Sequence, residues 1–296
     1  MLDTIPTGKT MLTIIALTPG MAGNTAGQDV GGSKGDLMPF FSFHGSAQGD
    51  SKLEVNGFNV NNAAASRRGF VPVRRPGDLS LIAISHLHPD HVSDLPALFW
   101  SIDQTRKEPP LPIAGPSGND LVPGFETFLK VLFDQTNGAF RVLGGMVGGA
   151  GRGVPLEVMV TDVKKREPSM VFNRQGITVT AIGIPHGDIP ALAYRVQAQN
   201  KSIVFSTDQN GSDPSFVEFA RGADVLVMHM AIAAGATSPL HAAPAVVGRV
   251  AQDAHVGRLV VSHIGQFDLN AAIADVKKFY TGPLTVGADL QCTPVP

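Results

Sequence analysis

The chain has 296 residues and a formal net charge of −2, which argues against a general nucleic-acid binder, because such proteins carry a basic surface. Hydrophobic residues make up 43% and charged residues 16%, a composition that suits a globular protein with a full core. The single cysteine, Cys292, excludes an intrachain disulfide framework and any site built from thiolates. Since no apolar run reaches the ~20 residues of a membrane span, we expect no membrane partner.

The first 36 residues differ in character from the rest. The apolar run at 11–17 imitates a secretory signal, but it is short, and we interpret it as a first β-strand. Residues 19–36 and 144–153 are rich in glycine and predict flexible connections. We therefore expect an N-terminal strand and glycine-rich segment at 1–36 and one larger domain at 37–296. The protein would be cytoplasmic, or periplasmic or secreted if residues 1–26 are a leader.

Apolar periodicity predicts the elements of the larger domain. The first half predicts a strand at 79–84, a short helix at 94–102 and a longer helix at 120–137, with Asp120 as its N-cap and Gly138 as its stop. The second half predicts strands at 177–184, 191–196, 202–207, 224–228, 259–262 and 284–286, and helices at 242–254 and 270–280. Clustered strands with a few helices are typical of packed sheets covered by helices.

The most informative motif follows the first of these strands, where His86, His88, Asp90 and His91 lie within six residues. Imidazole and carboxylate ligands suit zinc first, and iron or manganese next. A catalytic tetrahedral site keeps one position open, so four ligands exceed what one ion needs. The motif therefore predicts two adjacent metals, with His86 and His88 on one and Asp90 and His91 on the other.

Three later residues stand where predicted strands end: His186, Asp208 and His263. Strands that end on one side of a sheet bring such groups into a common crevice. Asp208 is the natural bridge between two cations, because a carboxylate has two oxygens.

The ordered set, from the His86–His91 motif through His186 and Asp208 to His263, resembles the metallo-β-lactamase superfamily from about residue 53 onward. Its flanking residues are most similar to the ribonuclease Z and arylsulfatase-like branch. The resemblance implies an α/β (α+β) fold, the four-layer αββα sandwich, with 37–296 as the catalytic domain. It also implies two metal sites that share Asp208, the first held by His86, His88 and His186, the second by Asp90, His91 and His263.

Three stretches depart from the family pattern. Val60–Ala63 lacks the carboxylate usual on an early strand, and such supporting partners can be worth ~10–100-fold in metal affinity or activity. Met228-His229-Met230 stands in place of His-Glu, and His241-Ala242-Ala243 in place of His-Ser/Thr-Thr. These departures affect the expected activity and substrate class more than the expected fold.

His241 and His229 are candidates for delivering a proton to the leaving group, because histidine titrates near neutral pH. The alternative for each is a structural histidine whose hydrogen bonds are satisfied within the fold. Together with Asp90 and Asp208, they make up the candidate catalytic residues.

The leading hypothesis is a hydrolase with two Zn²⁺ ions, or manganese or iron in their place, that acts on small ester, lactone or phosphodiester bonds through a metal-bridging hydroxide. Apolar residues near the motif, Leu95, Leu98, Phe99 and Trp100, favour a small, partly hydrophobic substrate. The absence of a basic arm disfavours transfer-RNA processing, and a homodimer remains open. The alternatives are an arylsulfatase, a ribonuclease Z-like phosphodiesterase, an iron redox enzyme of the same fold, or a metal-binding protein with a degenerate site.

Overall fold

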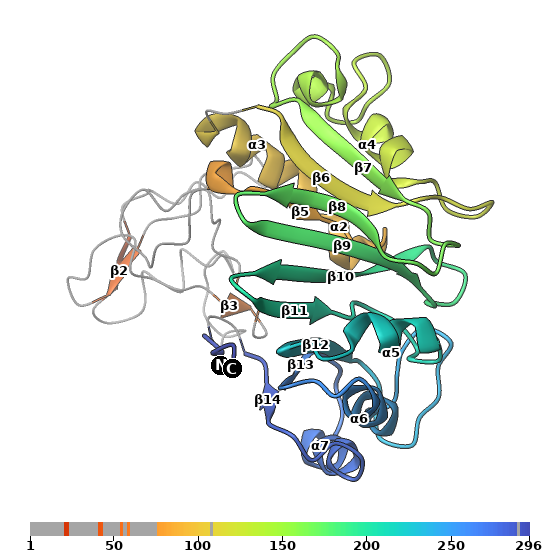
Figure 1. Ribbon diagram of the computed structural model, residues 1–296. Coiled ribbons are helices and arrows are strands. Elements are labelled where there is room, and N and C mark those ends of the chain that lie inside the picture. The colour runs from red at the N-terminus through yellow and green to blue at the C-terminus, as the bar shows by residue number, and fades with distance from the viewer. Residues whose placement is uncertain are drawn as a thin grey trace. The chain divides into compact units, whose positions relative to one another are not determined.

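The computed structural model describes residues 76–106, 109–288 and 291–296, together with four short strands nearer the N-terminus (Figure 1). These strands form two antiparallel pairs, β1 (Met21–Gly23) with β2 (Phe41–Phe43) and β3 (Glu54–Val55) with β4 (Phe58–Asn59). The chain divides into two units, 1–76 and 77–296. The predicted strand at 11–17, the Val60–Ala63 stretch and the predicted boundary at 36/37 lie outside the described residues. Strand β1 lies inside a segment predicted to be a loop, so that part of the prediction is wrong.

The second unit contains a large mixed sheet whose strand order is β14-β13-β12-β11-β10-β9-β8. Strands β8 to β11 are antiparallel neighbours, whereas β11 to β14 run parallel. The strands are β8 (Ser169–Arg174), β9 (Ile177–Ile184), β10 (Ala191–Ala198), β11 (Lys201–Phe205), β12 (Val225–Met230), β13 (Leu259–Ile264) and β14 (Leu284–Val286). The helices packed on its outer face are α5 (Pro214–Ala220), α6 (Pro244–Asp253) and α7 (Leu269–Lys277).

A smaller parallel sheet has the order β5-β6-β7. Its strands are β5 (Ile82–Ala83), β6 (Leu111–Pro116) and β7 (Leu156–Thr161). The helices of this half are α2 (Pro89–Val92), α3 (Leu95–Thr105), α4 (Phe125–Phe133) and the 3₁₀ segments η2 (Pro76–Asp78) and η3 (Arg141–Val147). Buried side chains of α3, α4 and η3 share one core with this sheet.

A third core lies between the two sheets. Ala114 of β6 packs there with Phe172, Ala181 and Leu192 of the large sheet, and with Tyr194, whose hydroxyl donates to the Ile84 carbonyl at 2.7 Å. With helices on both outer faces, the layers run helix, sheet, sheet, helix (Figure 1). The predicted four-layer αββα sandwich is therefore confirmed. Among the described residues, no helix is both long and apolar enough to cross a membrane.

The helix predicted at 120–137 is shorter than expected, because polar side chains compete for its backbone at both ends. The Asn119 side chain accepts from the Leu121 and Val122 N–H groups and holds a turn before Phe125. At the other end, Asp134 accepts from the N–H groups of residues 136 and 137. The predicted N-cap Asp120 and stop Gly138 are therefore wrong, and α4 covers Phe125–Phe133.

The segment 144–153 is also more ordered than predicted. Its first residues belong to η3, which buries Leu143 and Met146 against α4. A Cβ on Gly145 would lie 2.8–3.1 Å from three carbonyl oxygens of residues 151–153, so glycine is needed here for close backbone packing. The glycines indicate compactness at this place, not the flexible connection we predicted.

Candidate metal centre

The predicted ligands come from different strands and meet at one edge of the molecule. Strand β5 ends just before His86, and helix α2 carries Asp90 and His91. Residues after β9 and β11 supply His186 and Asp208, and β13 carries His263 near its end. The loops that follow β6 and β9 both lie at the right of Figure 1. The carboxyl ends of neighbouring strands thus build the crevice that the spacing predicted.

The inner group consists of His86, His88 and His186. His88 Nδ1 lies 3.1 Å from His86 Nε2 and 3.3 Å from His186 Nε2. His186 Nδ1 donates to the Leu240 carbonyl at 2.8 Å, so its Nε2 presents a lone pair to the group. Because His88 Nδ1 carries at most one proton, at most one of its two contacts is a hydrogen bond. A cation shared by the three nitrogens satisfies all of them at once.

The outer group consists of Asp90, His91 and His263. His91 Nε2 and His263 Nε2 lie 3.4 and 3.5 Å from Asp90 Oδ2, and the two rings stack with centroids 5.5 Å apart. This group is the more open one, since the Asp90 side chain is 63% exposed and that of His263 is 39% exposed. His263 has a φ of 47°, a left-handed conformation that is uncommon outside glycine and often marks functional sites.

Asp208 lies between the two groups. Its Oδ2 is 3.6 Å from the Nε2 atoms of both His91 and His263, and its ligand atoms also cluster with those of His86. Burial raises the pKa of the Asp208 carboxyl, but pairing with His91 and the charges of nearby histidines outweigh it and hold the pKa below its usual range. Thr207, with a φ of 52°, places this buried carboxylate in the crevice.

These distances fit a metal centre. Two ligands each ~2.1 Å from one tetrahedral ion lie ~3.4 Å apart, and the contacts within the inner and outer groups measure 3.1–3.5 Å. His91 Nε2 is a buried nitrogen that makes no hydrogen bond. Unsatisfied buried polar atoms at a functional site point to an ion. The residues present therefore suit a divalent metal.

Burial keeps histidines of the inner group neutral, which is the form that binds a metal. It lowers the pKa of His86 to about 3, with further lowering by His91 and His186, and it also lowers the pKa of His186. Both rings are therefore neutral at physiological pH, the form that binds metals. In contrast, pairing with Asp208 raises the pKa of His91 above its ordinary value, although burial works against this. Protons therefore compete more strongly for His91 than for His86 or His186.

The two candidates for proton delivery differ in access. His241 keeps 21% of its side chain exposed, and its Nδ1 lies 3.8 Å from Asp208 Oδ2. His229 is only 2% exposed, and its Nε2 accepts from the Ala242 N–H at 3.4 Å. The ring centroids of the two histidines are 5.3 Å apart. His241 is therefore the more accessible of the two, whereas His229 is buried and holds the backbone next to His241 through the Ala242 N–H.

The apolar residues predicted to line a substrate pocket do not do so. Leu95 and Phe99 are buried in the core beneath α3, and Leu98 packs against that core. Trp100 is partly exposed and lies under the Arg152 guanidinium at 5.0 Å. That part of the prediction is wrong, because α3 uses these residues to cover the small sheet.

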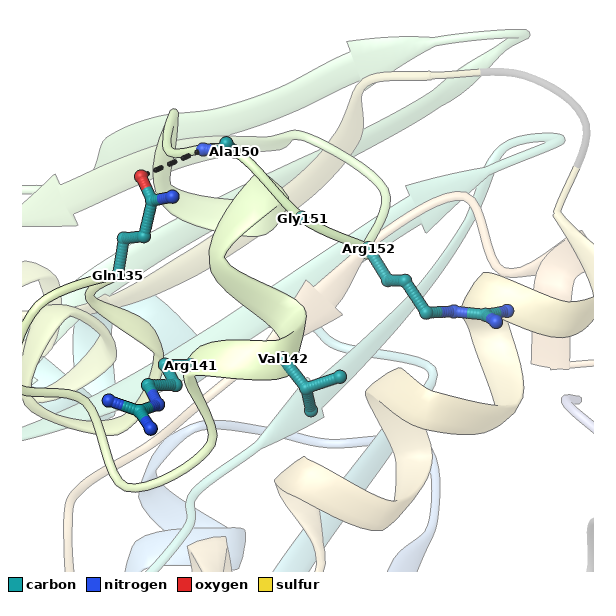
Figure 2. A pocket seen from close by; sticks show the side chains of 6 residues that line it. All are labelled: Gln135, Arg141, Val142, Ala150, Gly151 and Arg152. Carbon is teal, nitrogen blue, oxygen red and sulfur yellow. Dashed lines mark hydrogen bonds between the residues drawn. The ribbon is translucent and has the colours of Figure 1, made fainter.

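A surface depression of about 480 Å³ lies near the same helix, as Figure 2 shows. Its lining includes Gln135, Arg141 and Arg152 but none of the predicted ligands. Arg152 is already neutralised there by Asp103 at 2.7 Å. This depression is therefore not the metal centre.

Sequence reasoning missed a short basic run, Lys164-Lys165-Arg166, in the turn after β7. Most of its charge is paired, since Lys165 Nζ lies 3.5 Å from Glu167 and Arg166 Nε lies 3.2 Å from Asp213. Three consecutive cations were visible in the sequence, but their pairing was not. This run does not make the broad basic surface that nucleic-acid binders carry.

Comparison with known proteins shows the family to which the chain is related. The model of the beta-lactamase superfamily domain matches residues 57–264. Ribonuclease BN of Escherichia coli O6:K15:H31 (strain 536 / UPEC) is 27% identical over 227 residues, which cover 64% of this chain and 72% of that protein. Ribonuclease BN of Enterobacter sp. (strain 638) is 26% identical over 242 residues, with the same coverage.

Solved structures show the same fold. The metallo-beta-lactamase fold protein YhfI from Bacillus subtilis superposes with a TM-score of 0.54 at 21% identity, over 72% of this chain and 76% of that one. The short form of human tRNase Z gives a TM-score of 0.53 at 18% identity, over 75% and 81%. The match to the domain model, the fold and the clustered histidines and aspartates together lead to one conclusion: the chain belongs to the metallo-β-lactamase superfamily, most of whose members are metal-dependent hydrolases.

Proposed function

We propose that this chain hydrolyses small phosphodiesters with the help of two divalent metal ions, zinc in each site. The observation that carries the proposal is the buried Asp208 carboxylate, which lies between two groups of ligand atoms with metal-like spacing. The relatives named ribonuclease BN support phosphodiester chemistry within this superfamily. Zinc is the first choice for imidazole and carboxylate ligands.

The chain's own residues have distinct tasks in this proposal. The inner group (His86, His88 and His186) would hold one ion and the outer group (Asp90, His91 and His263) the other, with Asp208 shared between them. A divalent metal bound here supplies Lewis acidity, which lowers the pKa of water and polarises a phosphoryl oxygen. The Leu240 carbonyl fixes the orientation of the His186 ring through Nδ1.

Proton delivery to the leaving group falls to His241 in this proposal. Its Nδ1 is buried without a hydrogen-bond partner and faces the Asp208 carboxylate. His229 holds the backbone next to it through the Ala242 N–H, so we assign His229 a positioning role. General acids that are placed within reach of the leaving group contribute ~10²–10⁴-fold to rate.

From the sequence we expected small esters and lactones to be the better substrates, with weaker phosphodiesterase activity on small aryl compounds. Their main support was an apolar pocket beside the motif, and the residues named for it pack into a core or lie under Arg152. A phosphodiester is therefore the stronger proposal. We keep the expectation that transfer-RNA precursors are not processed, because the basic run at 164–166 is largely paired and RNA affinity depends on phosphate neutralisation.

Metal analysis combined with a substrate panel tests the proposal. We expect two equivalents of zinc per chain, turnover of bis(p-nitrophenyl) phosphate, weaker turnover of nitrophenyl esters and lactones, and none of a transfer-RNA precursor at physiological salt. Two bound metals without turnover of any diester would favour the alternative of a metal-binding protein with a degenerate site. One equivalent of metal, or iron alone in a fully loaded sample, would overturn the dinuclear zinc assignment.

A further inference from the structure

The connection between β12 and α6 carries His241, and its backbone is anchored to the segment that follows β9. The Gly187 N–H donates to the Pro239 carbonyl at 3.1 Å, and His186 Nδ1 donates to the Leu240 carbonyl at 2.8 Å. Pro239 and Leu240 are the two residues directly before His241. The place of the His241 ring in the crevice therefore depends on how these two carbonyls are held.

The side chain of Asn210 provides a third anchor for this connection. Its Nδ2 donates to the Pro239 carbonyl at 3.1 Å, the same oxygen that accepts from the Gly187 N–H. Asn210 stands two residues after Asp208. The bond therefore joins the segment that carries the shared carboxylate to the segment that carries His241.

Asn210 is itself held in place by contacts on both sides. Its Oδ1 accepts from the Ser212 N–H at 3.0 Å and from the Ser212 hydroxyl at 2.6 Å, which leaves Nδ2 directed at the loop. Its backbone N–H donates to the carbonyl of Pro185, the residue directly before His186, at 3.3 Å. One residue that belongs to neither group of ligands thus connects the three segments that carry Asp208, His186 and His241.

We propose that Asn210 is a positioning residue for His241, and that its side-chain amide keeps His241 Nδ1 at 3.8 Å from Asp208 Oδ2. The inference rests on the proposed function, in which His241 delivers a proton to the leaving group. Proton transfer needs the donor within hydrogen-bond reach of its target, and a displacement of ~1 Å can cost ~10²-fold in rate. The Gly187 bond to Pro239 remains when Asn210 is replaced, so the effect should be smaller than that of removing His241.

Kinetics on diesters with different leaving groups test this role. Asn210→Ala should slow diesters with poor leaving groups about tenfold, the upper range for one net hydrogen bond. Nitrophenyl diesters should be affected little, because they need no proton on departure. Metal content should stay unchanged, since the variant keeps the backbone bond to Pro185. In the His241→Ala background the same substitution should cost nothing further, because a residue that acts through His241 loses its effect with it.

Three further variants make the test specific. Asn210→Asp keeps the acceptor for Ser212 but turns a carboxylate oxygen towards the Pro239 carbonyl, so it should slow poor leaving groups at least as much as Asn210→Ala. Ser212→Ala keeps the Nδ2 donor and one bond to Oδ1, and should have no effect. Asn173→Ala removes an asparagine whose Oδ1 accepts from Thr178 between β8 and β9, and it should also leave the leaving-group dependence unchanged.

The position of His241 is also measured without turnover. Nuclear magnetic resonance of the zinc-loaded protein, labelled in its histidine rings, gives a His241 signal that is identified by its loss in His241→Ala. Asn210→Ala and Asn210→Asp should shift or broaden this signal. The signal of His255, an exposed histidine just after α6, should stay where it is in both variants.

The outcomes separate this inference from the proposed function. An unmoved His241 signal in Asn210→Ala, equal rate losses for good and poor leaving groups, or a full further loss in the double variant would each overturn the role of Asn210. A moved signal in a protein that hydrolyses no diester would support the positioning contact and count against the hydrolase.

Discussion

The inner and outer groups of ligands contain similar side chains but are held in different ways. His86 and His186 are fully buried, and hydrogen bonds from their Nδ1 atoms to the Ser85 hydroxyl and the Leu240 carbonyl fix their rings. Asp90 and His263 are 63% and 39% exposed, and the Asp90 carboxylate pairs with the two histidines of the same group. The same residue types thus form one group that is buried and oriented by outer hydrogen bonds and one that is open to solvent, because burial and outer hydrogen bonds decide how far each ring is fixed.

Removal of the residue that joins the two groups should have the largest effect. We expect Asp208→Ala to lower phosphodiester turnover by more than about a hundredfold, since even the loss of an outer partner costs ~10–100-fold. Metal content should fall below two equivalents, because two adjacent cations lose the carboxylate between them. Elemental analysis and steady-state kinetics measure both quantities.

Asp224→Ala is the matched control for that variant. Asp224 is a partly buried carboxylate that directly precedes β12 and accepts from the Ser202 N–H at 2.7 Å, away from the metal centre. Its loss should leave metal content and turnover unchanged. Normal turnover and two metals in Asp208→Ala would contradict the shared role of this residue.

His241 lies beside Asp208, and replacing it tests whether this residue delivers a proton to the substrate. His241→Ala should slow diesters with poor leaving groups about a hundredfold and affect nitrophenyl diesters little, because a good leaving group departs without a proton. A series of leaving groups of rising pKa gives the slope that checks this. Equal losses across the series would assign His241 a binding or structural role.

The buried histidines should make the metal-free protein sensitive to acid. Burial lowers the pKa of His86 to about 3 and of His229 to about 4. Below the ordinary histidine pKa of about 6.5, the unfolded chain therefore binds protons at these two residues that the folded chain does not bind. Stability from these groups is complete above pH ~6.5 and is lost as the pH falls towards the folded values. At pH 5 each of these two histidines should lower the free energy of unfolding by about 2 kcal/mol.

Urea unfolding of the chelator-treated protein at pH 7.5 and pH 5 measures this cost. The variant His229→Gln should lose less stability between the two pH values than the wild-type protein, because glutamine does not titrate. If the free energy of unfolding is the same at both pH values, the buried histidines are not held neutral.

The smallest expected effect compares the two groups directly. Because the pKa of His91 is raised by Asp208 whereas that of His86 is lowered by burial, protons should displace the outer metal first as the pH falls. Cobalt-substituted protein, followed by visible absorption from pH 8 to pH 5, should lose its two ions in two steps. Loss of both ions in a single step would show that the inner and outer groups do not differ in how readily protons displace their metal.

The contrast between the two halves of the domain shows what local pattern can predict. Strands β9 and β14 were predicted with their observed bounds, because each is a clear apolar run between turn residues. Strand β6 was missed, since it contains Pro112 and Pro116, which normally exclude a central strand. Both prolines lie outside the two residues of β6 that pair with β5, so the ladder tolerates them. Which residues of β6 pair with β5 is known only from the tertiary structure.

For the candidate site, the types of the candidate ligands, their order and their positions at strand ends could be predicted from the sequence, because a metal centre needs particular atoms at the ends of particular strands. The tertiary structure decided which nitrogens face one another, that the Leu240 carbonyl orients His186, and that His229 lies behind His241. It also buried Leu95 and Phe99 and left Leu121 exposed. These outcomes depend on contacts between residues far apart in the chain, and no local pattern records how such residues pack.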